Sequence, residues 1–240
     1  MNSAAGQSRI RMARLLVHVE GQTEENFVNE ALSPYLVAAG YHSVDARIVG
    51  NARQRSRRGG IIPWPSVRRD IVGHLREDSE CIATTMVDFY GLPQNGAAAW
   101  PGRLNAIGPN VLKKAGQVEK ALFEDVAVLM KADLRGRFIP FVVMHEFEGL
   151  LFSDCAAFSR AISRPNLEAK FTAVRNQFET PEDINDSPIT APSKRVEEPV
   201  AGYEKRFLGT LAALEIGLDR IRGECAHFDD WIKRLEALVQ

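Results

Sequence analysis

Short apolar segments alternate with amphipathic ones between residues 15 and 144. Four segments have the composition of strands, and the first and third are apolar enough to be buried on both faces: 15–20, 44–49, 81–88 and 138–144. Three segments between them carry apolar residues at helical spacing: about 23–40, 67–75 and 118–134. This alternation predicts an α/β fold with an open, mainly parallel sheet and helices on both faces.

Acidic residues stand where three of the predicted strands end. Glu20 closes the first strand, Asp88 closes the third, and the sequence His-Glu-Phe-Glu at 145–148 follows the fourth. In open parallel sheets the functional site lies beyond the carboxyl ends of the strands. We therefore expect Glu20, Asp88 and the acids of 145–148 to meet, with Glu24 reaching the same place from the start of the first helix.

A cluster of carboxylates requires a compensating cation, because like charges repel strongly in a partly dry cleft. Ligands that are all oxygen favour Mg²⁺ or Mn²⁺, which keep several waters and bind substrate phosphate. The predicted metal ligands are Glu20, Glu24, Asp88, Glu146 and Glu148. The competing explanation is that each acid, taken singly, caps a turn or complements a helix dipole.

The segment 145–148 has two possible arrangements. It is not the His-Glu-x-x-His pattern of zinc proteases. In a strand, Glu146 and Glu148 would share one face, whereas in a helix His145 and Glu148 would be neighbours. Both glutamates stay candidates, and His145 is a candidate for orienting a ligand or transferring a proton.

Charge is balanced over the whole chain, with a net value of −1 at pH 7. That balance argues against binding nucleic acid by overall charge, although basic residues can gather on one face. Four arginines lie close together at Arg53, Arg55, Arg57 and Arg58. They suit phosphate contact, whereas a solvated loop is the competing explanation.

The 240 residues, 45% of them hydrophobic, fit one globular domain or a domain with an appended part. We predict a flexible N-terminus at 1–12, an α/β core at 13–160 and a helical C-terminal extension at 161–240 that packs on the core. No apolar run is long enough to span a membrane, and the N-terminus lacks the apolar stretch of a signal peptide. Three scattered cysteines form no disulfide framework or zinc motif. We expect a cytoplasmic protein.

Four motifs make the chain resemble a known family: Val-Glu-Gly-Gln-Thr-Glu at 19–24, Met-Val-Asp-Phe-Tyr-Gly-Leu-Pro at 86–93, His-Glu-Phe-Glu-Gly-Leu-Leu-Phe at 145–152 and Ala-Pro-Ser-Lys-Arg at 191–195. Together they resemble a bacterial family catalogued as domain of unknown function 4276. The first motif is also similar to the opening of Toprim-like nucleases, including the overcoming-lysogenization-defect group.

The resemblance implies a Toprim-like fold, a catalytic Glu20 and metal-binding acids after a later strand. It also implies phage defence or genome maintenance beside a partner ATPase, and a downstream lysine that stabilises charge on phosphate. Lys194 is the first candidate for that lysine and Lys205 the second, with Arg195 as a further nucleic-acid contact. One departure is that the usual Asp-x-Asp is here Asp-Phe-Tyr at 88–90.

The sequence thus leads to a Mg²⁺- or Mn²⁺-dependent nuclease that cleaves DNA or RNA, including tRNA. The alternative is a non-catalytic Toprim-like subunit that binds an ATPase or nucleic acid, which the missing second aspartate motivates. A phosphatase or nucleotide hydrolase would use the same metal chemistry. The sequence leaves open the substrate, the number of metal ions and whether the chain forms a homo-oligomer.

Overall fold

The fold is built on a parallel sheet in a computed structural model that describes residues 13–49, 63–185, 187 and 189–240. The strand order is β2–β1–β3–β4, and β5 pairs with β3 beyond β4. Every strand pair is parallel. The strands are β1 (Arg14–Val19), β2 (Ser43–Ile48), β3 (Cys81–Asp88), β4 (Phe138–Ile139) and β5 (Val142–Val143). The predicted α/β class and the four strand positions are confirmed.

The predicted strand at 138–144 is divided into β4 and β5 around Pro140. Proline has no N–H to give to a strand ladder, so regular pairing stops there. Thr85 of β3 bridges the break, since its hydroxyl donates to the Phe141 carbonyl at 2.8 Å and accepts from the Phe141 N–H at 2.9 Å. The chain therefore stays beside β3 and continues to the carboxyl edge of the sheet.

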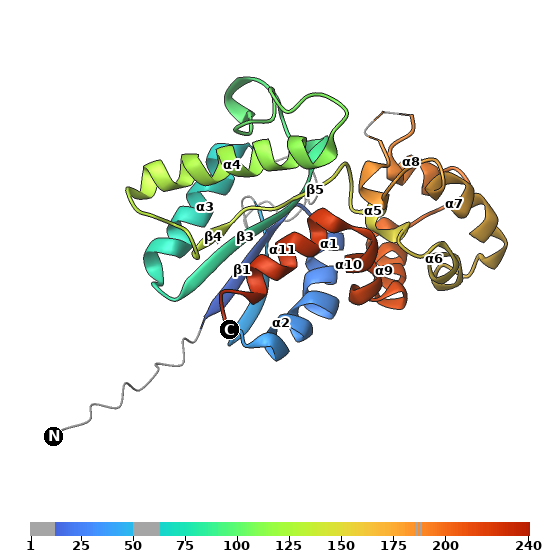
Figure 1. Cartoon of the computed structure of the whole chain (residues 1–240), viewed down its shortest axis with the longest axis horizontal. Helices are drawn as coiled ribbons and strands as arrows, with labels where there is room; N and C mark the ends of the chain where they lie inside the picture. Colours follow the sequence, from blue (N-terminus) through green and yellow to red (C-terminus); the bar gives the residue numbers. More distant parts are fainter. Residues whose placement is uncertain (1–12, 50–62, 186, 188) are drawn as a thin grey trace.

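Helices cover both faces of the sheet (Figure 1). One face carries α3 (Trp64–Glu77) and α4 (Val111–Met130). The other carries α1 (Gln22–Phe27), a π-helical turn η1 (Val28–Leu32), α2 (Ser33–Ala39) and α11 (Ala226–Glu236). Two separate clusters of buried apolar side chains correspond to these two faces. Helix α4 begins earlier than the predicted residue 118 because Asn110 caps it, accepting from the Lys113 N–H at 2.8 Å.

The chain after β5 forms a lobe of short helices to the side of the sheet (Figure 1). Its α-helices are α5 (Glu148–Leu151), α6 (Cys155–Ala161), α7 (Glu168–Arg175), α8 (Pro192–Glu197), α9 (Thr210–Ile216) and α10 (Leu218–Glu224). A π-helical turn, η6 (Lys205–Gly209), precedes α9. Four 3₁₀ turns complete the described elements: η2 (Phe89–Gly91), η3 (Gly96–Ala98), η4 (Pro165–Leu167) and η5 (Pro181–Asp183).

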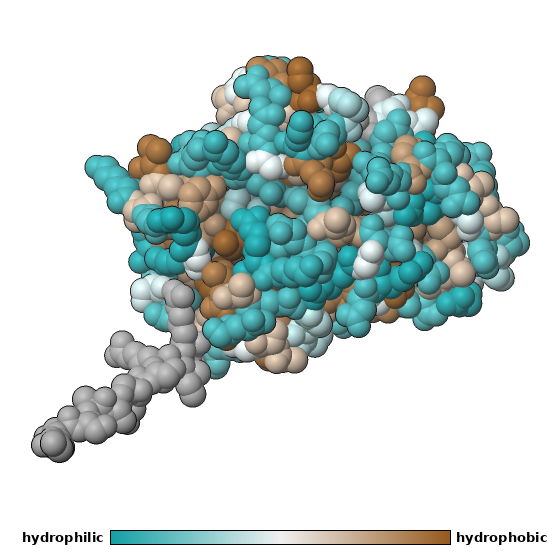
Figure 2. Space-filling model, in the orientation of Figure 1, coloured by the Kyte–Doolittle hydropathy of each residue, from teal (hydrophilic) through white to brown (hydrophobic). Residues whose placement is uncertain are grey.

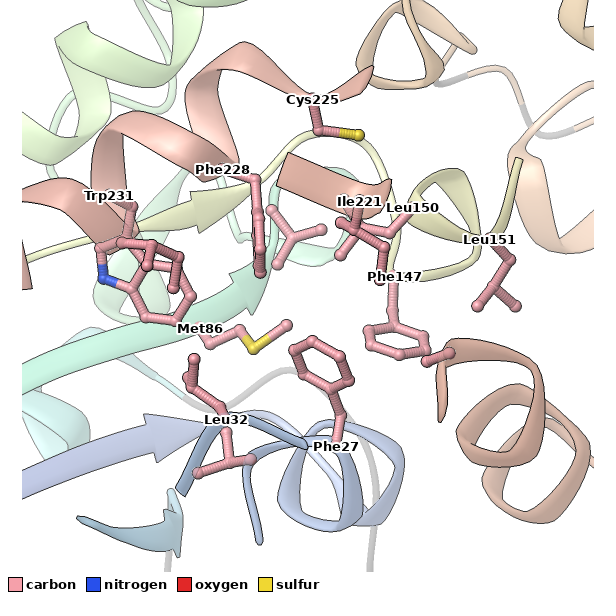
Figure 3. Close-up of a cluster of buried hydrophobic side chains, with 14 of the residues drawn as sticks. Phe27, Leu32, Met86, Phe147, Leu150, Leu151, Ile221, Cys225, Phe228 and Trp231 are labelled. Carbon is pink, nitrogen blue, oxygen red and sulfur yellow. The ribbon is translucent and has the colours of Figure 1, made fainter. Parts of the chain in front are cut away.

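Helix α11 returns from this lobe to the sheet and belongs to the central core. The ring of Trp231 stacks on Phe141 with centroids 4.2 Å apart, and its indole N–H donates to the Thr84 hydroxyl at 2.9 Å. Figure 3 shows Phe228 and Trp231 of α11 near Met86 of β3 and Phe27 of α1. The end of the chain therefore helps to fix the strands that carry the acidic residues.

Among the described residues, none of the helices has the length and the apolar character that a membrane span requires. The face seen in Figure 2 is largely hydrophilic, and its apolar residues form separate small patches.

Candidate active site at the carboxyl edge of the sheet

Four acids from separate parts of the sequence gather at the carboxyl edge of the sheet. Glu20 follows β1 directly, Glu24 lies in the first turn of α1, Asp88 ends β3, and Glu148 is the first residue of α5. Strands β1 and β3 are parallel neighbours, so Glu20 and Asp88 emerge side by side. The Asp88 N–H points to Glu20 Oε2 at 3.4 Å.

Backbone contacts and one aromatic pair hold these segments together. Asp88 accepts a hydrogen bond from the Phe147 N–H at 2.9 Å, which ties the end of β3 to the segment before α5. The Phe147 ring meets Phe27 of α1 edge-on, with centroids 5.4 Å apart, and both rings face the same core in Figure 3. A Cβ on Gly21 would lie 3.2 Å from Glu24 Oε2, so the glycine leaves room for that carboxylate.

The ammonium group of Lys205 lies against the acids. Lys205 Nζ is 2.9 Å from Glu148 Oε2 and 3.5 Å from Asp88 Oδ2. Its π-helical turn is pressed against the site: a Cβ on Gly209 would come within 3.2 Å of the Tyr203 hydroxyl and 3.6 Å of Thr23. Lys205 is therefore held between the strand ends and the C-terminal lobe.

The electrostatics of the cluster follow from its burial. Burial raises the pKa of Glu20, Asp88 and Glu148, and the negative charge of Glu24 raises that of Glu20 further. Burial alone would lower the pKa of Lys205, but the carboxylates of Asp88 and Glu148 raise it well above its ordinary value. The lysine is therefore charged at neutral pH, and it opposes the shifts of the acids.

Glu148 has the most unusual environment of the four acids. Its side chain is completely buried, and neither carboxylate oxygen accepts a well-aligned hydrogen bond from the part of the chain that the structure describes, although Lys205 lies close to one of them. The buried Tyr203 hydroxyl also has no hydrogen-bond partner among the described residues. Buried polar atoms without partners are rare in folded proteins, and a bound ion or ligand is one explanation for them.

The cluster fits a hard divalent cation, because such ions prefer carboxylate oxygens and the carboxylates here outnumber the Lys205 ammonium. The cluster is not a preformed metal site, because within the described ranges no three His, Cys, Asp or Glu side chains are placed to hold a metal ion. Lys205 already occupies a cationic position between Asp88 and Glu148.

His145 and Glu146 lie beside this cluster and make other contacts. The structure shows neither a continued strand nor a continued helix here, because His145 has a left-handed φ of 60° and turns the chain between β5 and α5. The His145 ring faces the Ile184 carbonyl through Nδ1 and Lys114 Nζ at 3.3 Å through Nε2. Glu146 accepts from the Ser193 N–H at 2.8 Å, so α8 fixes its position.

The basic residues predicted to contact phosphate are placed differently from one another. Lys194 and Arg195 lie in helix α8 rather than in the expected loop, because Pro192 is well suited to a first helical turn. Lys194 is half exposed and pairs with Glu197 at 2.5 Å, whereas Lys205 faces the acids. The four arginines at 53–58 lie outside the described residues.

Two buried basic residues near the site were not found from the sequence. The Arg103 guanidinium lies 3.8 Å from the centre of the Phe89 ring and donates to the Phe89 carbonyl at 3.0 Å. Lys114 Nζ lies 5.2 Å from the same ring. Neither belongs to any of the motifs identified in the sequence: Arg103 is an isolated arginine, and Lys114 follows Lys113 in the first turn of α4, an ordinary helix. Tyr203 was also missed, because it belongs to no such motif.

The fold and the site together define an α/β protein with an open parallel sheet and a candidate cation or phosphate site at its carboxyl edge. The chain belongs to the family described as domain of unknown function (DUF4276), whose model matches residues 19–236. That match includes all four motifs and every described site residue. No curated protein and no solved structure gives a significant match.

Proposed function

We propose that this protein is a Mg²⁺- or Mn²⁺-dependent nuclease that hydrolyses phosphodiester bonds in DNA or RNA. The observation that carries the proposal is the meeting of Glu20, Asp88 and Glu148, which come from three separate segments, with Lys205 against Asp88 and Glu148. Acids of this kind are costly to bury, and in this protein burial opposes their ionisation. A cluster that works against stability is a common mark of a functional site.

The side chains of the chain have separate roles in this proposal. Glu20, Glu24, Asp88 and Glu148 would hold the metal ion, and Glu20 would also accept a proton from the attacking water. The ammonium of Lys205 would face the negative charge that develops on the phosphate. A bound ion would neutralise phosphate charge and make water a better nucleophile.

A polymeric substrate is favoured over a small phosphate ester by the position of the site. The acids lie at the carboxyl edge of the sheet, and the four arginines at 53–58 follow β2, the strand next to β1, in the sequence. A role in phage defence or genome maintenance beside a partner ATPase, and a Toprim-like relationship, rest on the resemblance of the first motif and are part of this proposal.

Cleavage assays test the proposal directly. The full chain is incubated with supercoiled plasmid or with tRNA, with Mg²⁺, Mn²⁺ or EDTA, and products are resolved on gels. We expect cleavage that depends on the metal and falls by about 100-fold or more in Glu20→Gln. Glu30→Gln is the matched control, because Glu30 is an exposed glutamate in the adjoining π-helical turn and should leave the rate unchanged. Equal cleavage by wild type and Glu20→Gln would refute the proposal.

A non-catalytic subunit that binds an ATPase or nucleic acid is the second candidate function. It is favoured by the absence of a ready-made metal cage in the described residues and by Tyr90 in place of the second aspartate. This reading predicts no Mn²⁺ binding in calorimetric titrations. A clear Mn²⁺ titration that is lost in Asp88→Asn would reject it.

A further inference from the structure

We propose that Tyr90 and Lys194 bind the nucleotide beside the scissile phosphate, with the Tyr90 ring stacked on its base and the Lys194 ammonium on its phosphate. A base that stacks on a side chain is unpaired, so the substrate is single-stranded nucleic acid at this position. This inference rests on the proposed function, because it names the form of DNA or RNA that the same site takes.

The first support is the side on which the acidic site opens to solvent. The carboxylates of Glu24, Asp88 and Glu148 are buried, whereas those of Glu20 and Glu146 belong to partly exposed residues. Burial and the charge of Glu24 raise the pKa of Glu20, and Glu146 lies near enough to raise it further. The two partly exposed acids are therefore neighbours, and a phosphate that reaches the site approaches past them.

The second support is the position of Tyr90 at this opening. Tyr90 lies two residues after Asp88. Its N–H donates to the His145 carbonyl at 3.0 Å, which fixes it next to the segment that carries Glu146. Its side chain is 38% exposed, and in the described part of the chain Phe207 is the only other exposed aromatic side chain. An exposed ring beside the acids is available to stack on a base.

The third support is a basic side chain on the same side of the site. Glu146 accepts from the Ser193 N–H at 2.8 Å, which places the first turn of α8 beside the opening, and Lys194 comes next in the chain. Its hydrogen bond to Glu197 raises its pKa, and the nearby Glu146 and Tyr90 raise that pKa further. The Lys194 side chain is half exposed, and an exposed ion pair contributes little stability. The ammonium can therefore leave Glu197 for a phosphate at small cost.

Oligonucleotide binding tests the inference without relying on cleavage. The full chain is titrated into fluorescently labelled oligo(dT) or oligo(U) of about 12 nucleotides, or into an abasic DNA strand of equal length, and anisotropy is followed. The buffer contains Ca²⁺, an ion that takes carboxylate ligands. We expect base-bearing strands to bind about 10-fold tighter than the abasic strand, and tighter than the same sequence in a duplex. The tighter of oligo(dT) and oligo(U) identifies the sugar.

Substitutions assign the effect to the two side chains. Tyr90→Leu should bind base-bearing and abasic strands alike, whereas Tyr90→Phe keeps the ring and should retain the preference of wild type. Lys194→Gln should weaken the binding of both kinds of strand by a similar factor, because it removes a contact to phosphate. Phe207→Leu is the matched control and should bind as wild type does. It removes the other exposed ring, which does not share a face with Lys205 because the two lie two residues apart in a helical turn.

The possible outcomes separate this inference from the proposed function. A base preference that is lost in Tyr90→Leu, with no cleavage by wild type in Mg²⁺ or Mn²⁺, would support the inference and refute the nuclease. Cleavage that depends on Glu20 but comes with no base preference would overturn the inference and leave the nuclease in place. An equal loss of preference in Phe207→Leu, tighter binding of the duplex, or no binding of any strand would also overturn the inference. If Tyr90→Leu does not fold, as judged by circular dichroism, the wild-type preference for base-bearing strands decides.

Discussion

Acidification should destabilise this protein through one buried histidine in β1. His18 is 1% exposed; its Nδ1 lies 3.2 Å from the Thr84 carbonyl, and its Nε2 lies 3.1 Å from Nδ1 of His74. Burial, reinforced by the nearby His74, lowers the pKa of His18 from 6.5 to about 4. The folded protein therefore holds this ring neutral at a pH where the unfolded chain would protonate it.

The sign and size of the effect follow from proton linkage. A group with a lowered pKa in the folded state contributes its full stability above its unfolded pKa, here 6.5, and loses it as the pH falls towards the folded pKa of about 4. Between pH 7 and pH 4.5, protonation of the unfolded chain at this one site lowers the free energy of unfolding by about 2 kcal/mol.

Urea denaturation of wild type and His18→Leu, each at pH 7 and at pH 4.5, isolates this contribution. Leucine is close in volume to histidine and has no titratable group, and titrating residues that do not contact His18 affect both proteins alike. We expect the stability of wild type relative to the variant to fall by about 2 kcal/mol over this range. Equal losses in the two proteins would refute the assignment of His18 as a buried neutral ring.

Two further perturbations test the core and the site. Trp231→Ala removes the stack on Phe141 and the hydrogen bond to Thr84, and should lower the free energy of unfolding by about 3–5 kcal/mol in urea titrations; a loss below about 1 kcal/mol would contradict the packing described for α11. Glu148→Gln should raise the thermal midpoint of the metal-free protein at pH 8 but not at pH 4. The reason is that an acid whose pKa is raised in the folded state stabilises the fold less as the pH rises through that pKa. An unchanged midpoint at pH 8 would contradict the buried charge at Glu148.

The sequence by itself determined the α/β class and the convergence of Glu20 and Asp88. Both follow from local patterns, because buried parallel strands read as short apolar runs and the carboxyl ends of parallel strands meet at one edge. The position of strand 138–144 was also predicted, whereas its division at Pro140 depends on bridging by Thr85 of a distant strand. These features could be predicted because each depends on residues that are close to one another in the sequence.

Only the tertiary structure decided which lysine faces the acids and how the segment 145–148 turns. Lys205 is 117 residues from Asp88 in the sequence, and its position depends on the close packing of Gly209 against Tyr203. Lys194 had the more suggestive motif, but it lies on α8 and pairs with Glu197. Contacts between distant segments arise from the packing of whole elements, and no local spacing of residues records them. For that reason the acids of the site were predicted from the sequence, whereas the tertiary structure was needed to place Lys205 against them.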